Sequence, residues 1–199
     1  MKINSLSKHR IKKIIGCFAS ELTAIDTAQK LKIHRNTVNK YYRFIRESIA
    51  SYQHSQYEIF LAEHPSPEKF YIGWHRNLGL TLNPQPDTIH YHLSVEGRHV
   101  FVGAEVEGQT PTGTVLSEGQ QQEAANNLSN DNVVSYFYNY AKSKLTKFYG
   151  VRPQYVDLYI RELEFRFNNQ ETTLAPLIWK IVSQKPISLE EGSETTAIH

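Results

Sequence analysis

The chain has 199 residues, of which 40% are hydrophobic and 12% aromatic, so it can bury a substantial core. Its single cysteine, Cys17, excludes an internal disulfide framework and a cysteine-rich zinc site. No apolar run approaches the roughly 20 residues of a membrane helix, and the first residues lack the apolar core of a signal peptide. We therefore expect a globular cytoplasmic protein with no membrane partner.

The net charge of +2 conceals an uneven distribution. Residues 1–50 hold eleven of the 22 Lys and Arg but three of the 20 Asp and Glu, so this segment carries +8 and the rest of the chain −6. Clustered basic charge is typical of surfaces that bind phosphates, because each neutralised phosphate releases counterions. A merely soluble pair of charged helices would have the same composition, so the pattern of residues must decide.

Apolar residues at helical spacing predict three helices in this basic segment. Ser7 is a candidate N-cap for the first and Thr23 for the second, and the third begins near Arg35. The predicted buried positions are Leu6, Ile11, Ile14, Ile15 and Phe18, then Ala24, Ile25, Ala28 and Leu31, then Val38, Tyr41, Tyr42, Ile45 and Ile49. The connection at 32–34 is short enough for a helix-turn-helix.

A helix-turn-helix contacts base edges through the N-terminal half of its last helix. The side chains predicted to lie outside the apolar stripe there are Arg35, Asn36, Thr37, Asn39, Lys40 and Arg43. Arginine suits guanine, asparagine suits adenine, and threonine and lysine suit phosphates or either base. The pattern predicts that residues 1–50 bind double-stranded DNA, although three helices could also form a simple packing unit.

The remaining chain predicts an α+β domain. Residues 51–67 are interpreted as a linker, and 69–74 and 88–105 as extended segments, the latter a hairpin that turns at Glu96-Gly97. A polar segment at 107–131 is interpreted as a loop, and three helices follow: one from about 134 to Gly150, one after Pro153, and one around 174–181. The domain would span 68–183, with a disordered tail at 184–199.

Two stretches carry a resemblance to a known family. Residues 133–151 read VVSYFYNYAKSKLTKFYGV and residues 159–169 read YIRELEFRFNN; residues 28–38 read AQKLKIHRNTV. Both parts resemble small bacterial insertion-sequence transposases of the ISXO-like group. The resemblance covers residues 7–49 and 133–169 and implies a reduced RNase H-like fold, binding to element ends, and a homodimer because such ends are inverted repeats.

The same resemblance implies that three carboxylates should hold Mg²⁺ for DNA strand transfer. The first position falls on Pro67, or on Glu68 if the register shifts by one, and the best candidate for the second is Glu118. The third falls on Ser135, whose hydroxyl brings no charge to a divalent ion. The chain is thus expected to bind DNA but to have lost strand-transfer chemistry, unless Glu68, Glu118 and Asp131 form an improvised Mg²⁺ site.

Three further interpretations stay open. The chain could be a helix-turn-helix regulator or transposition inhibitor derived from a transposase, or a decaying relic with no selected role. His90 and His92 could bind one metal ion beside a nucleophilic Tyr138 or Tyr140, as in DNA nickases, or could be a solvent-facing pair on a hairpin.

Charged residues of the last helices also need an interpretation. The lysines of the 133–150 helix could contact the DNA backbone or simply solubilise the helix; they are Lys142, Lys144 and Lys147. Glu162, Glu164 and Arg166 are interpreted as structural residues that form ion pairs with this lysine-bearing helix.

Overall fold

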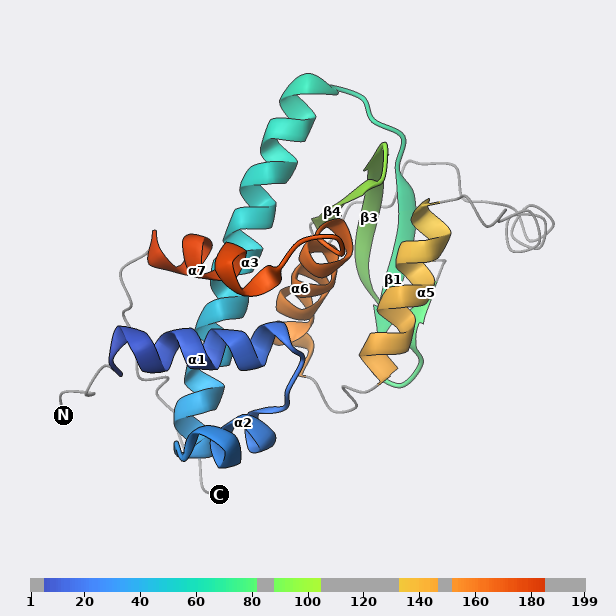
Figure 1. The fold of residues 1–199 in the computed structure, drawn as a ribbon. Coiled ribbons are helices and arrows are strands. Elements are labelled where there is room, and N and C mark those ends of the chain that lie inside the picture. Colours follow the sequence, from blue (N-terminus) through green and yellow to red (C-terminus); the bar gives the residue numbers. More distant parts are fainter. Residues whose placement is uncertain (1–5, 82–87, 105–132, 147–151, 185–199) are drawn as a thin grey trace, which may run out of the picture. The chain divides into compact units, whose positions relative to one another are not determined.

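The computed structural model describes residues 6–81, 88–104, 133–146 and 152–184 (Figure 1). The chain divides into two compact units, one formed by residues 1–48 with 173–199 and the other by residues 49–172. No helix in the described ranges is both long enough and apolar enough to cross a membrane. The predicted α+β class is confirmed, since the described residues form helices and an antiparallel sheet.

The first unit contains the three predicted N-terminal helices: α1 (Lys8–Ala19), α2 (Ala24–Leu31) and the beginning of α3 (Arg35–Glu63). Both predicted caps are present, because Ser7 accepts a hydrogen bond from the Arg10 amide and Thr23 accepts one from the Asp26 amide. Helix α7 (Leu174–Ser183) also belongs to this unit and packs against α1. The buried apolar side chains of α3 in this unit are Val38, Tyr41, Tyr42 and Ile45, as predicted, and Ser48 is buried with them. The prediction was wrong for Ile25 of α2, which is 49% exposed.

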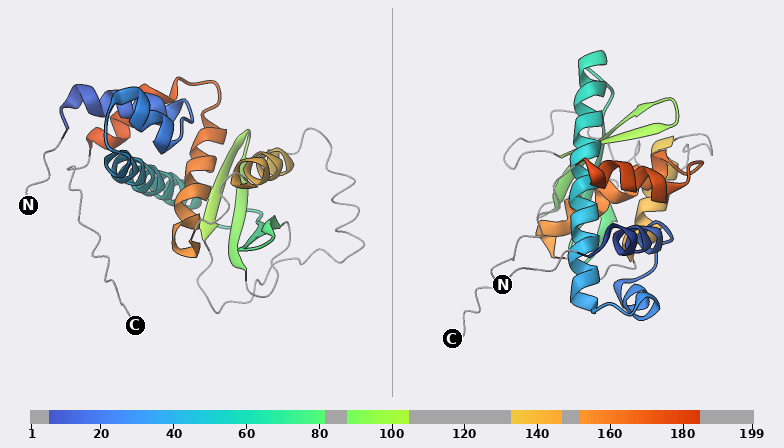
Figure 2. Two further views of the ribbon diagram at one scale, coloured as in Figure 1. Left: turned by 90° about the horizontal axis from the view of Figure 1, so that it is seen from below. Right: turned by 60° about the vertical axis from the view of Figure 1, so that its left-hand side comes forward.

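The segment interpreted as a linker is helical as far as Glu63. Helix α3 runs without interruption through residues 51–63, and Figure 2 shows it as one continuous helix. Its buried side chains continue at helical spacing and are Ile49, Gln53, Tyr57 and Phe60. Gln53 is polar and Tyr57 carries a hydroxyl group. A polar glutamine inside the stripe hid the periodicity, and the helix ends just before Pro65, where a proline disfavours helical backbone in the residue before it.

The second unit is built on a four-stranded antiparallel sheet with the order β2-β1-β3-β4. Its strands are β1 (Phe70–His75), β2 (Gly79–Thr81), β3 (Ile89–Glu96) and β4 (His99–Ala104). The predicted hairpin is confirmed: Glu96 pairs with His99, and Gly97 has the positive φ of 57° that the turn requires. The short strand β2 was not predicted, because three residues are too few to show an alternating pattern.

Helices α5 (Val133–Leu145) and α6 (Val156–Asn168) pack on this sheet, the latter preceded by a 3₁₀ turn at Pro153–Tyr155. Their apolar side chains form one core with Ile72, Trp74, Leu80, Tyr91, Leu93, Val100 and Val102 of the strands. On the opposite face, Tyr57 and Phe60 of α3 lie against His92 and Phe101. The sheet is therefore covered on both faces, which explains why β3 is buried over four consecutive residues.

Several predicted features fall outside the described residues. They are the whole polar segment at 107–131, the helix stop at Gly150, and the tail from residue 185 onward.

Candidate nucleic-acid interface

The predicted DNA-contacting residues share the outer face of the first turns of α3. Arg35, Asn36, Asn39, Lys40 and Arg43 are exposed and Thr37 is partly exposed. The apolar residues between them are buried on the other side of the helix. The helix thus separates a polar face from a core face, with the predicted side chains available to a ligand in solvent.

The turn before α3 is held by backbone hydrogen bonds. Ile33 N donates to Ala28 O at 3.0 Å and Lys32 N donates to Gln29 O at 3.4 Å, a Schellman arrangement that ends α2. Lys32 occupies the left-handed region, with φ 52° and ψ 51°. His34 accepts a hydrogen bond from the Asn36 amide through Nδ1 at 3.2 Å, so its side chain satisfies one of the free amides at the start of α3.

Tyr42 joins the three helices from the buried side. Its hydroxyl donates to Leu22 O at 2.9 Å and lies 2.7 Å from Thr27 Oγ1, while its ring meets Phe18 edge-on at 5.0 Å. Thr27 is fully buried, so this hydroxyl pair satisfies a polar group that would otherwise lie in the core. The orientation of α3 against α1 and α2 is therefore fixed by specific contacts.

Arg43 differs from its neighbours because Glu47 already engages it. Arg43 Nε lies 2.8 Å from Glu47 Oε1 one turn away, and both side chains are exposed. A phosphate would have to compete with this carboxylate, although an exposed pair of this kind contributes at most about 1 kcal/mol.

Two lysines of the second predicted basic group, Lys142 and Lys144, lie in the described part of α5. Lys142 Nζ lies 5.4 Å from the centre of the Tyr138 ring and Lys144 Nζ lies 5.7 Å from that of Tyr140, so each lysine lies over a different tyrosine. Residues two apart on a helix do not share a face. Lys147 lies outside the described residues.

The positions expected for metal-binding carboxylates are only partly described. Glu68 is exposed and lies just before β1, and Ser135 is half-buried in the first turn of α5. Glu118 and Asp131 lie outside the described residues. Within those residues, none of these positions belongs to a group of potential metal ligands.

His92 is not solvent-facing, which corrects one interpretation of the histidine pair. It is 6% exposed, and its Nε2 lies 2.6 Å from the Tyr57 hydroxyl of α3. Its imidazole occupies the space beside Gly103, where a Cβ atom would clash with Nε2. Burial, with smaller effects from Lys69 and Arg161, lowers the pKa of His92 to about 4, so the neutral ring is the folded form at neutral pH.

The geometry also separates His92 from the tyrosine proposed as a nucleophile. Tyr138 lies in the core beneath the other face of the sheet and donates a hydrogen bond to Leu80 O at 3.2 Å. His90, two residues before His92 on β3, is half-buried. Because His92 and Tyr138 lie on opposite faces of the sheet, the nickase arrangement has no common site for these two residues.

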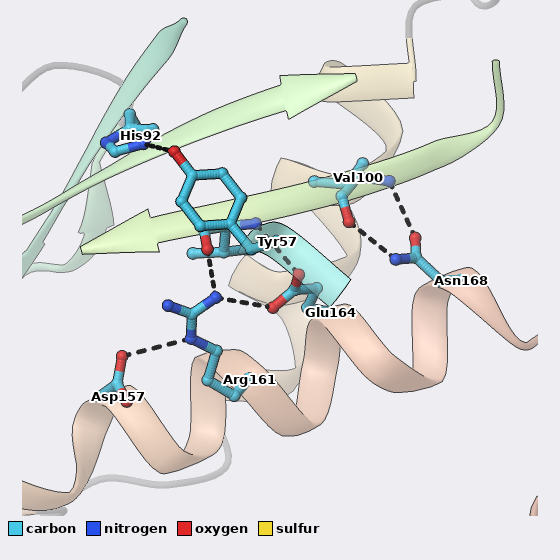
Figure 3. A network of polar contacts seen from close by, with 8 residues as sticks. Tyr57, His92, Val100, Asp157, Arg161, Glu164 and Asn168 are labelled. Atoms are coloured by element: carbon cyan, nitrogen blue, oxygen red, sulfur yellow. Dashed lines mark hydrogen bonds and ion pairs between the residues drawn. The ribbon is translucent and has the colours of Figure 1, made fainter. Parts of the chain in front are cut away.

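Polar residues of α6 form hydrogen bonds and ion pairs with the sheet and with one another. Figure 3 shows Arg161, Glu164 and Asn168 directed at the edge strand β4. Asn168 Oδ1 accepts from Val100 N at 2.9 Å and its Nδ2 donates to Val100 O at 2.7 Å. One turn earlier, Glu164 Oε1 accepts from Val102 N at 3.1 Å while Arg161 donates to Val102 O.

The charged groups in this network neutralise one another within α6. Arg161 Nη1 lies 3.2 Å from Glu164 Oε2, and Arg166 Nε lies 2.8 Å from Glu162 Oε1. Both pairs join residues of the same helix. Burial raises the pKa of Glu164 to about 7, although Arg161 and the hydrogen bonds from Val102 and Gln53 act in the opposite direction.

Comparison with known proteins gives a partial relative. The chain is 43% identical over 47 residues to an uncharacterized transposase-like protein of Haemophilus influenzae. This chain is similar in part to a transposase-like protein. The match covers 24% of this chain and 38% of that protein, so the similarity concerns well under half of either. No protein-family profile matches the chain, and no solved structure does.

The relation to transposases is therefore supported, while the ISXO-like group stays a prediction. The sequence did not predict the roles of Tyr57, Gln53 or Arg161. The available signal was the spacing of Ile49, Tyr57 and Phe60, which continues the stripe of α3 with Gln53 as its polar member, whereas the polar composition of residues 51–67 indicates a linker.

Proposed function

We propose that this chain is a DNA-binding protein of transposase origin that recognises double-stranded DNA through α2, the turn at 32–34 and the first turns of α3. The observation that carries the proposal is the exposed polar row on α3, which follows a three-residue turn and lies opposite a buried face. This is the arrangement that a recognition helix needs. The partial similarity to a transposase-like protein supports the same function.

The side chains divide into two roles. Arg35 and Lys40 would supply positive charge to phosphates, with Arg35 also able to bind a guanine through two hydrogen bonds. Asn36 and Asn39 would read adenines, and the His34 cap holds the first turn that presents them. Specificity would therefore depend on the asparagines and overall affinity on the cations.

Titration of fluorescent duplexes at several salt concentrations tests this function. The wild-type chain should bind DNA, and the double variant Arg35→Ala/Lys40→Ala should bind weakly, with the salt slope reduced by about 2. The matched control is Arg98→Ala/Lys180→Ala, which removes the same charge from exposed positions elsewhere. Equal weakening by both double variants, or no binding to any duplex, would contradict the proposal.

The proposal includes the loss of strand-transfer chemistry, supported by the serine at position 135 where the resembling family has a carboxylate. We expect no strand cleavage with Mg²⁺ or Mn²⁺.

Such a protein could act as a regulator or as an inhibitor of intact transposases, and homodimers would match inverted repeats. The ISXO-like origin and an RNase H-like second domain are part of this proposal. Metal-dependent nicking that survives Tyr138→Phe and is lost in Glu68→Gln would instead indicate an improvised Mg²⁺ site.

A further inference from the structure

A group of possible metal ligands lies within the unit formed by residues 49–172, where α3 ends and the β3–β4 hairpin turns. One ligand atom each from Glu63, His64 and Glu96 lies within 4.8 Å of the others. Glu63 and His64 follow one another at the end of α3, while Glu96 is the last residue of β3. Two carboxylates and an imidazole thus converge from segments far apart in the sequence.

The hydrogen bond of His64 favours the tautomer that a metal site needs. His64 Nδ1 lies 3.2 Å from Phe60 O, and because a carbonyl only accepts, Nδ1 carries the proton. In the neutral ring, the lone pair is then on Nε2, which lies 3.6 Å from Glu96 Oε1. Metal-binding histidines are commonly oriented in this way by a carbonyl on the other ring nitrogen.

The imidazole is also held in place by packing. The Phe60 ring stacks on the His64 ring, with 4.7 Å between the ring centroids and an interplanar angle of 25°. Phe60 also stacks on Phe101 of β4, with a centroid distance of 4.3 Å and an interplanar angle of 11°. Phe60 is buried, so this stack anchors a half-exposed histidine to the sheet. A ligand whose rotamer is fixed loses less entropy when it binds a metal.

We propose that Glu63, His64 and Glu96 bind a divalent transition-metal ion of the Zn²⁺ class. Imidazole nitrogen with carboxylate oxygen is a ligand set that zinc accepts, and three protein ligands leave a position for water. The ion would neutralise two carboxylates that otherwise repel each other and would fasten the hairpin to the end of α3. This site is separate from the proposed DNA interface and uses none of its residues.

Calorimetric titration of the untagged full-length chain with ZnCl₂ at pH 7.5 tests the proposal. The wild-type chain should bind one equivalent at this site. His64→Ala and Glu96→Gln should each weaken the affinity by about tenfold or more. The matched control is His54→Ala, because His54 lies on the same helix, is exposed and is 3.9 Å from Glu58. Circular dichroism establishes that each variant is folded, and Glu63→Gln replaces His64→Ala if the latter is not.

Cobalt substitution supplies a second measurement. Co²⁺ absorption in the visible range should appear with the wild-type chain and disappear in His64→Ala, and a large excess of Mg²⁺ should not displace the ion. The absence of saturable binding, undiminished affinity in His64→Ala and Glu96→Gln, or equal weakening by His54→Ala would show that these residues form only a surface ion pair.

Discussion

The outer face of α3 and the polar face of α6 place similar residues in opposite settings. Arg35, Asn36 and Lys40 are exposed to solvent. By contrast, Arg161, Glu164 and Asn168 form hydrogen bonds to the backbone of β4. Helix α6 lies beside a strand at the edge of a sheet, whose outward N–H and C=O groups need partners. A polar motif is therefore structural where it lies next to backbone N–H and C=O groups that need partners. Where it faces solvent, it can bind a ligand.

The largest effect should come from Glu164→Ala, which removes the acceptor of Val102 N and leaves the Arg161 guanidinium buried without its closest carboxylate. We expect a loss of about 3–5 kcal/mol in the free energy of unfolding. Denaturant titration at pH 7 measures it. The control is Glu171→Ala, since the Arg98–Glu171 pair is 90% and 91% exposed and its loss should cost under about 1 kcal/mol. Similar losses for the two variants would remove the distinction between the helices.

The pH dependence of stability should reveal His92. Its folded pKa of about 4 lies below the ordinary 6.5, so its contribution is complete above pH 6.5 and is lost as the pH falls toward 4. The loss should be on the order of 3 kcal/mol. Glu164 acts oppositely, because its raised pKa of about 7 gives a contribution that is complete below about pH 4.5 and is lost as the pH rises.

The two contributions can be separated by measuring the free energy of unfolding of the Glu164→Gln variant across pH 4–7. Because glutamine does not titrate, only the contribution of His92 remains in this variant. Ring-proton NMR gives an independent check, because His92 should stay neutral at pH values where exposed histidines become protonated. Protonation of His92 near pH 6.5 would contradict the buried Tyr57–His92 contact.

A smaller effect is expected from Tyr42→Phe. It leaves the buried Thr27 hydroxyl without the partner at 2.7 Å and frees the Leu22 carbonyl, so the first unit should lose about 1–2 kcal/mol. Tyr136→Phe is the control, since Tyr136 is 49% exposed, and a surface change of this kind stays within about 0.5 kcal/mol. Thermal unfolding of the two variants makes the comparison, and equal midpoints would show that the Tyr42 hydroxyl does not stabilise this unit.

The smallest expected effect is a gain. Lys32→Gly should stabilise the chain by about 0.5–1 kcal/mol, because φ 52° is strained for lysine and natural for glycine. Lys30→Gly removes the same charge from the last turn of α2, where glycine should cost about as much as it gains at position 32. Opposite signs for these neighbours support the turn geometry, and a loss at both positions contradicts it.

The sequence predicted the N-terminal helices well because their apolar spacing and their caps are local signals. It failed at residues 51–63, because the buried Gln53 and Tyr57 form hydrogen bonds with Glu164 and His92, which lie more than thirty positions away in the sequence. For the same reason, the sequence leaves a solvent-facing His92 open: the burial of this residue depends on Tyr57 and on the space beside Gly103. The exposed row on α3 was predictable from amphipathic spacing, but on α2 the same spacing predicted a buried Ile25 that is 49% exposed.

The bonds from Asn168, Glu164 and Arg161 to β4 also affect how the protein behaves at high concentration. An open strand edge is a template for pairing with another chain, and thus for aggregation or strand exchange between copies. Here the side chains of α6 take the hydrogen-bonding positions of Val100 and Val102 that an incoming strand would need. The other edge of the described sheet is β2, which has three residues, and so short a strand offers few hydrogen bonds to an incoming strand.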